Sequence, residues 1–174
     1  TPIRYHVSLR VLHWLIAVML VAMLFTGTFV LGETLNADPN KLSVLRMHMI
    51  GGGLVLVLTL LRLFFRMKTA HPAPLLTGNV WADRLAPSVH WLLYVLVLVM
   101  AGSGMGIALQ AGLPVILFAG QGSLPQDFND LLPRSVHGAI ATVLFLFIAL
   151  HVAAALYHQF IKKDGLLARM GFGK

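Results

Sequence analysis

The chain has 174 residues, of which 58% are hydrophobic and only 11% are charged, and its formal net charge is +7. This composition is typical of membrane spans and excludes an ordinary soluble domain with a charged surface. The absence of cysteine excludes disulfides, iron–sulfur clusters and covalent C-x-x-C-H haem attachment, so any bound metal needs nitrogen or oxygen ligands.

Four apolar blocks follow one another along the chain. They cover residues 11–31, 45–65, 89–109 and 136–160. Each is close to or above the ~20 residues that a helix needs to cross ~30 Å of hydrocarbon. We therefore predict an all-α integral membrane protein, a single domain over residues 1–174 that packs as a four-helix bundle. Neither a cleavage site nor a soluble remainder follows the first block, so we expect it to be a retained span.

Lysine and arginine in the short connections predict the orientation of the chain. Ten of them fall on one side and three on the other. We expect both termini to be cytoplasmic in a bacterial inner membrane, with the loops around 33–44 and 111–134 outside. The positive charge then reflects topology and not nucleic-acid binding. The inner set is Arg4, Arg10, Arg62, Arg66, Lys68, Arg84, Lys162, Lys163, Arg169 and Lys174, and the outer set is Lys41, Arg46 and Arg134.

The spans contain an internal similarity. LHWLIAVMLVAM in the first block resembles VHWLLYVLVLVM in the third, and MHMIGGGLVLVLTLLR in the second aligns with VHGAIATVLFLFIALH in the fourth. This alignment sets His48 over His137 and Arg62 over His151. Two duplicated hairpins would pack as a four-helix bundle, which builds cofactor sites from side chains on facing helices.

Histidines recur at two depths in the predicted bundle. His48 and His137 begin their spans from the outside, whereas His13 lies at the inner start of the first span. His151 follows His137 by 14 residues. That spacing corresponds to a rotation of only about 40° and a rise of about 21 Å along a helix. His137 and His151 therefore face one seam at two depths, which suits two stacked b-type haems.

The depths predict the axial ligands of two haem irons. We assign His48 with His137 to an outer haem and His13 with His151 to an inner haem, so that each haem bridges two helices. Polar side chains within hydrocarbon are costly and usually functional, which favours ligation for a matched set. His90 sits in an HW pair at the same depth as His13 and stays an alternative inner ligand. The third span is otherwise expected to act as support.

Small residues are predicted where a flat haem approaches the backbone closely. Ordinary packing of membrane helices also selects small residues, so each glycine keeps both interpretations. The segment GSGMG at 102–106 lies late in a span with no preceding strand, and we interpret it as helix packing or a kink. The candidate haem-packing glycines are Gly27, Gly51, Gly52, Gly53 and Gly138.

Four motifs around these histidines resemble the bacterial cytochrome b561 family. They are SLRVLHWL, LRMHMIGG, RSVHGAIA and the more specific ALHVAAALYHQFIKKDGLLARM, and the similarity covers nearly the whole chain. The resemblance implies a four-span bundle with two haem b groups under bis-histidine ligation and a quinone as electron partner. The sequence departs from the family in the outer loop PVILFAGQGSLPQDFND and in the glycine-rich end of the third span.

The resemblance and the charges suggest an enzyme. With both axial positions filled by histidine, electrons would pass through the haem edges. Arg46 and Arg134 lie two and three residues before the outer ligands, where they could steer an anion or pair with haem propionates. We expect a superoxide:ubiquinone oxidoreductase that oxidises extracytoplasmic superoxide. The alternative is a quinone-linked electron-transfer subunit that serves a separate redox partner.

The inner side offers candidate contacts for a propionate or for quinone. Arg62, His158 and Lys163 are the residues we single out, and His158 also competes as a ligand because it lies seven residues beyond His151. His6 and His71 are expected to be solvated. The expected partners are the lipid bilayer, quinone and superoxide, and the sequence leaves the oligomeric state open.

Overall fold

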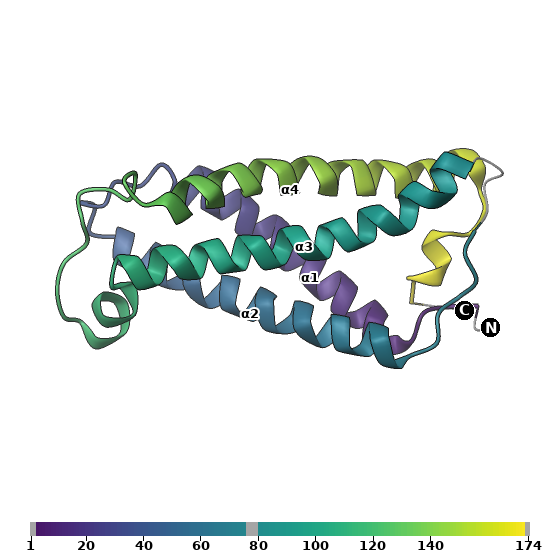
Figure 1. Ribbon diagram of the computed structural model, residues 1–174, viewed down its shortest axis with the longest axis horizontal. Coiled ribbons are helices and arrows are strands. Elements are labelled where there is room, and N and C mark those ends of the chain that lie inside the picture. Colours follow the sequence, from purple (N-terminus) through teal and green to yellow (C-terminus); the bar gives the residue numbers. More distant parts are fainter. Residues whose placement is uncertain (1–2, 76–79, 173–174) are drawn as a thin grey trace.

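Four long helices lie side by side along the long axis of the molecule in a computed structural model that describes residues 3–75 and 80–172 (Figure 1). In the figure α1 runs obliquely behind the other three. No strand occurs in the described ranges. The helices are α1 (Val7–Thr26), α2 (Lys41–Lys68), α3 (Val80–Gln110) and α4 (Leu132–Tyr157).

Two of the long helices continue directly into π-helical turns. The π-helix η1 (Gly27–Leu31) extends α1, and η3 (His158–Lys162) extends α4. Their wider turns are closed by bonds from the amide of Gly32 to the carbonyl of Gly27 at 2.9 Å, and from Lys163 to His158 at 2.8 Å. A further π-turn η2 (Val115–Ala119) and a short 3-10 helix η4 (Leu167–Arg169) lie outside the four helices.

Each helix is long and apolar enough to cross a membrane. The spans are Val7–Leu31, Lys41–Lys68, Asp83–Gln110 and Leu132–Lys162. Every predicted block lies within one of them, which confirms the four-helix membrane fold. The helices extend beyond the blocks because their polar ends stay helical at the membrane interface, where long cationic side chains reach water.

The two ends of the bundle differ in what they carry. Residues 3–6 and 163–172 lie at one end, together with the described part of the α2 to α3 connection, and we name this the terminal end (Figure 1). The amide of Tyr5 donates to the carbonyl of Arg169 there at 3.1 Å. The connections 32–40 and 111–131 lie at the opposite end, which we name the loop end.

The helices pack as two hairpins. Close backbone contacts run along α1 with α2 and along α3 with α4, with fewer between α2 and α3. By contrast, α4 makes almost no close backbone contact with α1 or α2. The pairing agrees with the hairpins expected from the internal similarity. It also leaves α4 connected to the first hairpin mainly through side chains.

Two apolar clusters occupy the interior. One lies at the loop end around Leu45, Ala108, Leu113 and Leu117. The other lies in the middle of the bundle around Leu144, which is fully buried, and joins residues of α2, α3 and α4. Many other large apolar side chains point outward, as expected for helices that meet lipid. The second cluster is completed by Val55, Leu96 and Val97.

Truncation of Leu144 tests this interior. Leu144 is 0% exposed, whereas Leu150 on the same helix is 54% exposed. We expect Leu144→Ala to lower the free energy of unfolding by about 2–5 kcal/mol, because a buried leucine leaves a cavity. Leu150→Ala serves as the control, and denaturant titration in detergent micelles measures both. Equal losses in the two variants would contradict the assigned core.

Candidate functional site

Two histidines face each other near the loop end. His48 on α2 and His137 on α4 have ring centroids 6.1 Å apart and ring planes inclined by 73°. The two helices make almost no close backbone contact, so mainly their side chains span the interval. The predicted outer pair is therefore brought together.

Three histidines gather near the terminal end. The rings of His13 on α1 and His151 on α4 are 6.2 Å apart, with planes inclined by 70°. His90 on α3 lies closer to His151, at 5.3 Å and 86°. Its Nδ1 hydrogen bonds to the carbonyl of Ala86, one turn earlier in α3, at 2.6 Å. The inner pair and its rival thus occupy one level.

The ring separations can be compared with those of a metal held between two imidazoles. Metal–imidazole bonds of about 2.0 Å on both sides would put the two ring centroids roughly 6.3 Å apart. The pairs at 6.1 and 6.2 Å match this value, whereas the 5.3 Å between His90 and His151 is too short. Edge-to-face ring pairs span the same distances, so the separation of the backbones is a necessary second observation. Within the described residues, no group of three or more His, Asp or Glu side chains is placed to hold a metal ion.

His137 is held by α3 through its ring nitrogen. Its Nδ1 lies 3.0 Å from Ser103 Oγ and 3.1 Å from the carbonyl oxygen of Met100. A proton on Nδ1 satisfies both contacts and leaves Nε2 available as a ligand. Ser103 was not among the predicted site residues, and the third span was expected to act as support apart from the alternative ligand His90. The GSGMG segment contained the signal, because its serine lies at the depth of His137.

Two glycines lie against the rings of the loop-end pair. A Cβ on Gly27 would lie 3.1 Å from His48 Cε1, and a Cβ on Gly104 would lie 3.2 Å from His137 Cε1. Gly27 was predicted at a close approach, and its neighbour is the imidazole of a candidate ligand. Gly104 was not among the candidates. Backbones can approach these rings because both positions lack a side chain.

Of the other four candidate glycines, Gly51, Gly52 and Gly138 face side chains of the bundle, whereas a Cβ on Gly53 would meet open space. A Cβ on Gly52 would just reach Met23 Cε at 4.0 Å, and a Cβ on Gly138 would lie 3.1 Å from a terminal nitrogen of Arg134. Gly138 therefore leaves room for the guanidinium of Arg134 along α4.

The two loop-end arginines differ in their contacts. Arg46 donates from Nε and from a terminal nitrogen to the carbonyl of Leu117, at 3.0 and 2.6 Å. Its guanidinium thereby holds the π-turn η2 against α2. Arg134 is exposed and has no hydrogen bond to the described residues. Lys41, which is buried, donates to the carbonyls of Leu31 and Thr34.

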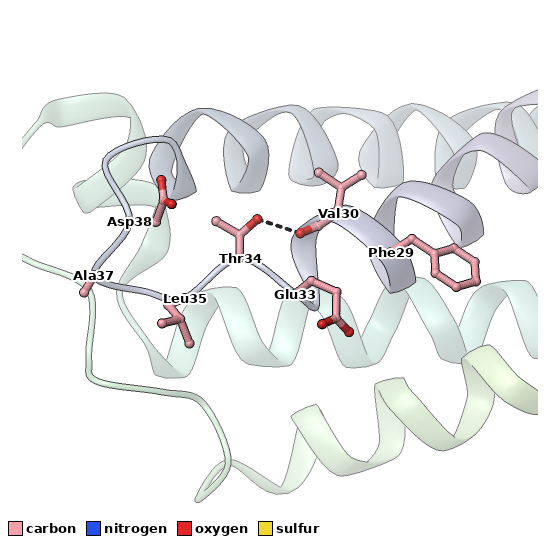
Figure 2. A pocket seen from close by; sticks show the side chains of 7 residues that line it. All are labelled: Phe29, Val30, Glu33, Thr34, Leu35, Ala37 and Asp38. Atoms are coloured by element: carbon pink, nitrogen blue, oxygen red, sulfur yellow. Dashed lines mark hydrogen bonds between the residues drawn. The ribbon is translucent and has the colours of Figure 1, made fainter.

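A recess of about 580 Å³ opens at the loop end, beside the connection between α1 and α2 (Figure 2). Glu33 and Asp38 bring carboxylates to it, and the Thr34 hydroxyl donates to the carbonyl of Val30 at 2.6 Å. No histidine contributes to its wall. Its negative charge disfavours an anionic ligand. The lining residues are Phe29, Val30, Glu33, Thr34, Leu35, Ala37 and Asp38.

Arg62 is the cation closest in level to the inner histidines. Its terminal nitrogen donates to Tyr94 Oη at 2.6 Å, and its guanidinium carbon lies 5.3 Å from the centroid of that ring. Its Nε is buried and has no partner among the described residues. One terminal nitrogen of the guanidinium is therefore bound to Tyr94, whereas the Nε–H is still able to donate a hydrogen bond. That is the geometry in which an arginine can bind a carboxylate.

His158 is tied to the segment that follows it. Its Nδ1 lies 2.5 Å from Asp164 Oδ2, and the two side chains are 19% and 27% exposed. The hydrogen bond from His158 lowers the pKa of Asp164 below the ordinary carboxyl value. Lys163 between them adopts a left-handed conformation, φ 54°, and ends η3. The side chain of Lys163 is exposed and makes no hydrogen bond to the described residues.

The two histidines expected to be solvated have structural contacts. The exposed His6 accepts a hydrogen bond at Nδ1 from the amide of Ser8 at 3.3 Å and caps α1. His71 packs against the ring of Tyr5 at 5.8 Å, and its Nε2 is buried without a partner among the described residues. Burial lowers the pKa of His71. The ring of His71 is therefore partly covered and not fully solvated.

Residues 164–172, which we name the C-terminal segment, lie against the start of α1. Arg10 donates to the carbonyl of Gly171 at 2.6 Å, and Trp14 Nε1 donates to that of Met170 at 2.9 Å. Arg10 also lies 5.2 Å from the ring of Phe172. The contact between His158 and Asp164 fixes where this segment leaves η3.

Known proteins resemble the chain over nearly its full length. A family model described as prokaryotic cytochrome b561 matches residues 4–173. Cytochrome b562 of Cereibacter sphaeroides is 30% identical over 173 residues, which cover 91% of this chain and 89% of the relative. Cytochrome b561 homolog 1 of Escherichia coli (strain K12) is 28% identical over 168 residues, with 91% and 92% covered. A probable superoxide oxidase CybB of Yersinia pestis is 26% identical over 171 residues, with 91% and 90% covered.

The contact between His158 and Asp164 predicts a pH-dependent release of the C-terminal segment. The pKa of Asp164 is lowered in the folded state, so the contact stabilises this state above the ordinary carboxyl range and is lost as pH falls through the lowered value. Because the chain has no cysteine, a nitroxide on Ala168→Cys reports on this segment alone. We expect an unchanged, immobilised spectrum from pH 7 down to about pH 4 and a mobile component below it.

Asp164→Asn removes the ionised acceptor at every pH. The same label should then show the mobile component already at pH 7. A label that stays immobile in this variant would contradict the role given to the contact.

Proposed function

The chain belongs to the prokaryotic cytochrome b561 family, and from this premise we propose that residues 1–174 form a transmembrane di-haem b cytochrome that oxidises superoxide and reduces ubiquinone. The family implies b-type haem and electron transfer in a membrane. The observation that carries the rest is the presence of two histidine pairs, at 6.1 and 6.2 Å, at two levels of one bundle.

We assign His48 with His137 to the loop-end haem and His13 with His151 to the terminal-end haem. His13 is preferred over His90 because the ring of His90 lies only 5.3 Å from that of His151. The separation of α4 from α1 and α2 also fits a flat group seated between them. A haem b, when bound, supplies a reversible one-electron iron couple.

The protein's own contribution is to hold these rings and to separate the two levels. Two imidazoles would hold each haem, so a small oxygen species would exchange electrons with the haem without binding its iron. Leu144 lies on α4 halfway between His137 and His151, and the apolar cluster around it keeps water out of the interval. The levels are about 21 Å apart along the helix.

We propose that the terminal end is cytoplasmic and the loop end extracytoplasmic, in a bacterial inner membrane. Among the described residues, nine lysines and arginines lie toward the terminal end and three toward the loop end, which supports this orientation under the positive-inside rule. Superoxide formed outside the membrane would then meet the level of His48 and His137.

Superoxide is the proposed electron donor. The relative named as a probable superoxide oxidase supports it, although at 26% identity. Arg134 is exposed three residues before His137 and is the cation best placed to attract an anion, since Arg46 is committed to Leu117. In the overall reaction two superoxide ions become two dioxygen molecules, and one quinone takes up two electrons and two protons.

Quinone reduction is assigned to the terminal end. His158 and Lys163 lie where α4 ends, and His158 already exchanges a hydrogen bond with Asp164. That pair provides a group able to carry a proton to a quinone oxygen. Arg62 is better suited to a haem propionate, because it is half-buried beside Tyr94 at the level of His13.

The second candidate function is a quinone-linked subunit that accepts electrons from a separate redox protein. The carboxylates of Glu33 and Asp38 favour it, because they give the loop end a negative recess that suits a basic partner surface. Co-purification of a redox protein with the intact membrane complex would support this function over superoxide oxidation.

The inner ligand assignment predicts opposite results for two neighbouring histidines. His13→Ala should lower the haem content from two to one per chain, because it removes an axial ligand. His90→Ala should keep two haems. Pyridine-haem quantitation with reduced-minus-oxidised spectra measures both variants, and the assignment fails if His90→Ala is the variant that loses a haem.

The donor assignment predicts an electrostatic contribution from Arg134. Arg134→Gln should slow reduction by superoxide several-fold at low ionic strength, and the difference should shrink in ~0.5 M salt as charges are screened. Arg84→Gln at the opposite end of the bundle is the control. Stopped-flow absorbance of the haem measures the rates. A parent protein reduced no faster by superoxide than by a neutral one-electron donor would refute superoxide as substrate.

A further inference from the structure

We propose that Ser103 is a positioning residue for the loop-end haem: together with the Met100 carbonyl it holds the proton of His137 on Nδ1 and lowers the reduction potential of that haem. The inference rests on the proposed function, because it takes His137 to be an axial ligand. It adds a determinant on α3, a helix that supplies neither ligand of the proposed pair.

The three groups form a closed set of hydrogen bonds. Ser103 Oγ donates to the carbonyl of Met100 at 2.9 Å, which uses the only proton of the hydroxyl. Toward His137 Nδ1, at 3.0 Å, Ser103 Oγ must therefore act as an acceptor. The Met100 carbonyl is also an acceptor, 3.1 Å from the same nitrogen. Both contacts require a proton on Nδ1, so Nε2 carries the lone pair that a metal needs.

The residue after Ser103 permits this approach. A Cβ on Gly104 would lie 3.2 Å from His137 Cε1 and 3.5 Å from Nδ1. The distance to Cε1 is shorter than an ordinary van der Waals contact. A side chain there would push the ring from α3. Close backbone packing of α3 along α4 is consistent with this requirement.

The loop-end pair is chemically unequal as a result. The Nδ1 of His48 is buried and has no hydrogen-bond partner in the described part of the chain. Neither His13 nor His151 makes a hydrogen bond to the described residues. His137 is therefore distinguished among the four proposed ligands by having Nδ1 bound to two acceptors.

A hydrogen bond donated from Nδ1 makes Nε2 the more basic ligand, as outer partners of metal-bound histidines generally do. A more basic ligand stabilises the oxidised iron more than the reduced iron. Ser103 should thus lower the reduction potential of the loop-end haem without touching the terminal-end haem. Removal of the Ser103 hydroxyl should weaken the lowering of this potential and not abolish it, because the Met100 carbonyl still accepts a hydrogen bond from Nδ1.

Ser103→Ala tests the proposal, with Ser88→Ala as a matched control. Ser88 lies on the same helix and donates to the carbonyl of Arg84 at 2.9 Å, but it contacts no histidine. In redox titrations of the full-length protein, we expect Ser103→Ala to raise the equilibrium constant for reduction of one haem threefold or more, which raises its midpoint potential. That corresponds to roughly 30 mV for one electron. Ser88→Ala should shift neither midpoint.

Three further outcomes separate this inference from the proposed function. If His137→Ala keeps both haems, His137 is not a ligand and the proposed function fails together with the inference. If His137→Ala loses one haem while Ser103→Ala leaves both midpoints unchanged, the inference alone is overturned. If Ser103→Ala does not assemble, Ser103→Thr takes its place, because threonine keeps the hydroxyl. Parental midpoint potentials in Ser103→Thr would support the positioning role of the hydroxyl. An upward shift like that expected for alanine would overturn it.

Discussion

The arrangement depends above all on the spacing of two histidines along one helix. His137 and His151 are 14 residues apart on α4, so both rings face one side of the helix at depths about 21 Å apart. Imidazole nitrogens inside a membrane need partners, and each ring meets a histidine of the first hairpin, His48 at one level and His13 at the other. The fully buried Leu144 lies midway and separates the two polar levels by an apolar layer.

The two hairpins are alike in outline and differ where their chemistry must differ. The internal similarity aligns Arg62 with His151, so the terminal-end level holds a guanidinium in one hairpin and an imidazole in the other. Tyr94 fixes that guanidinium at 2.6 Å. His90, the counterpart of His13, becomes a third ring at this level. Of the positions that this similarity matches between the two hairpins, four are proposed ligands.

The number of helices and the depth of each histidine could be predicted, because long apolar runs have few alternatives and the rise per residue of a helix is fixed. The contact of Ser103 with His137 could not, since it depends on the rotation of α3 about its axis, and a helix that is apolar on nearly all sides does not encode that rotation. Arg46 and Arg134 were equivalent in the sequence. Arg46 donates hydrogen bonds to the Leu117 carbonyl only because η2 folds onto α2. Contacts of this kind, between segments far apart in the chain, leave no local pattern in the sequence.

The most direct test of the central claim is an X-ray structure of the purified protein with data collected at the iron absorption edge. Two anomalous peaks are expected about 21 Å apart along the bundle. One should lie between His48 and His137 and the other between His13 and His151. A single peak, or an inner peak bound by His90 in place of His13, would contradict the assignment of two bis-histidine levels.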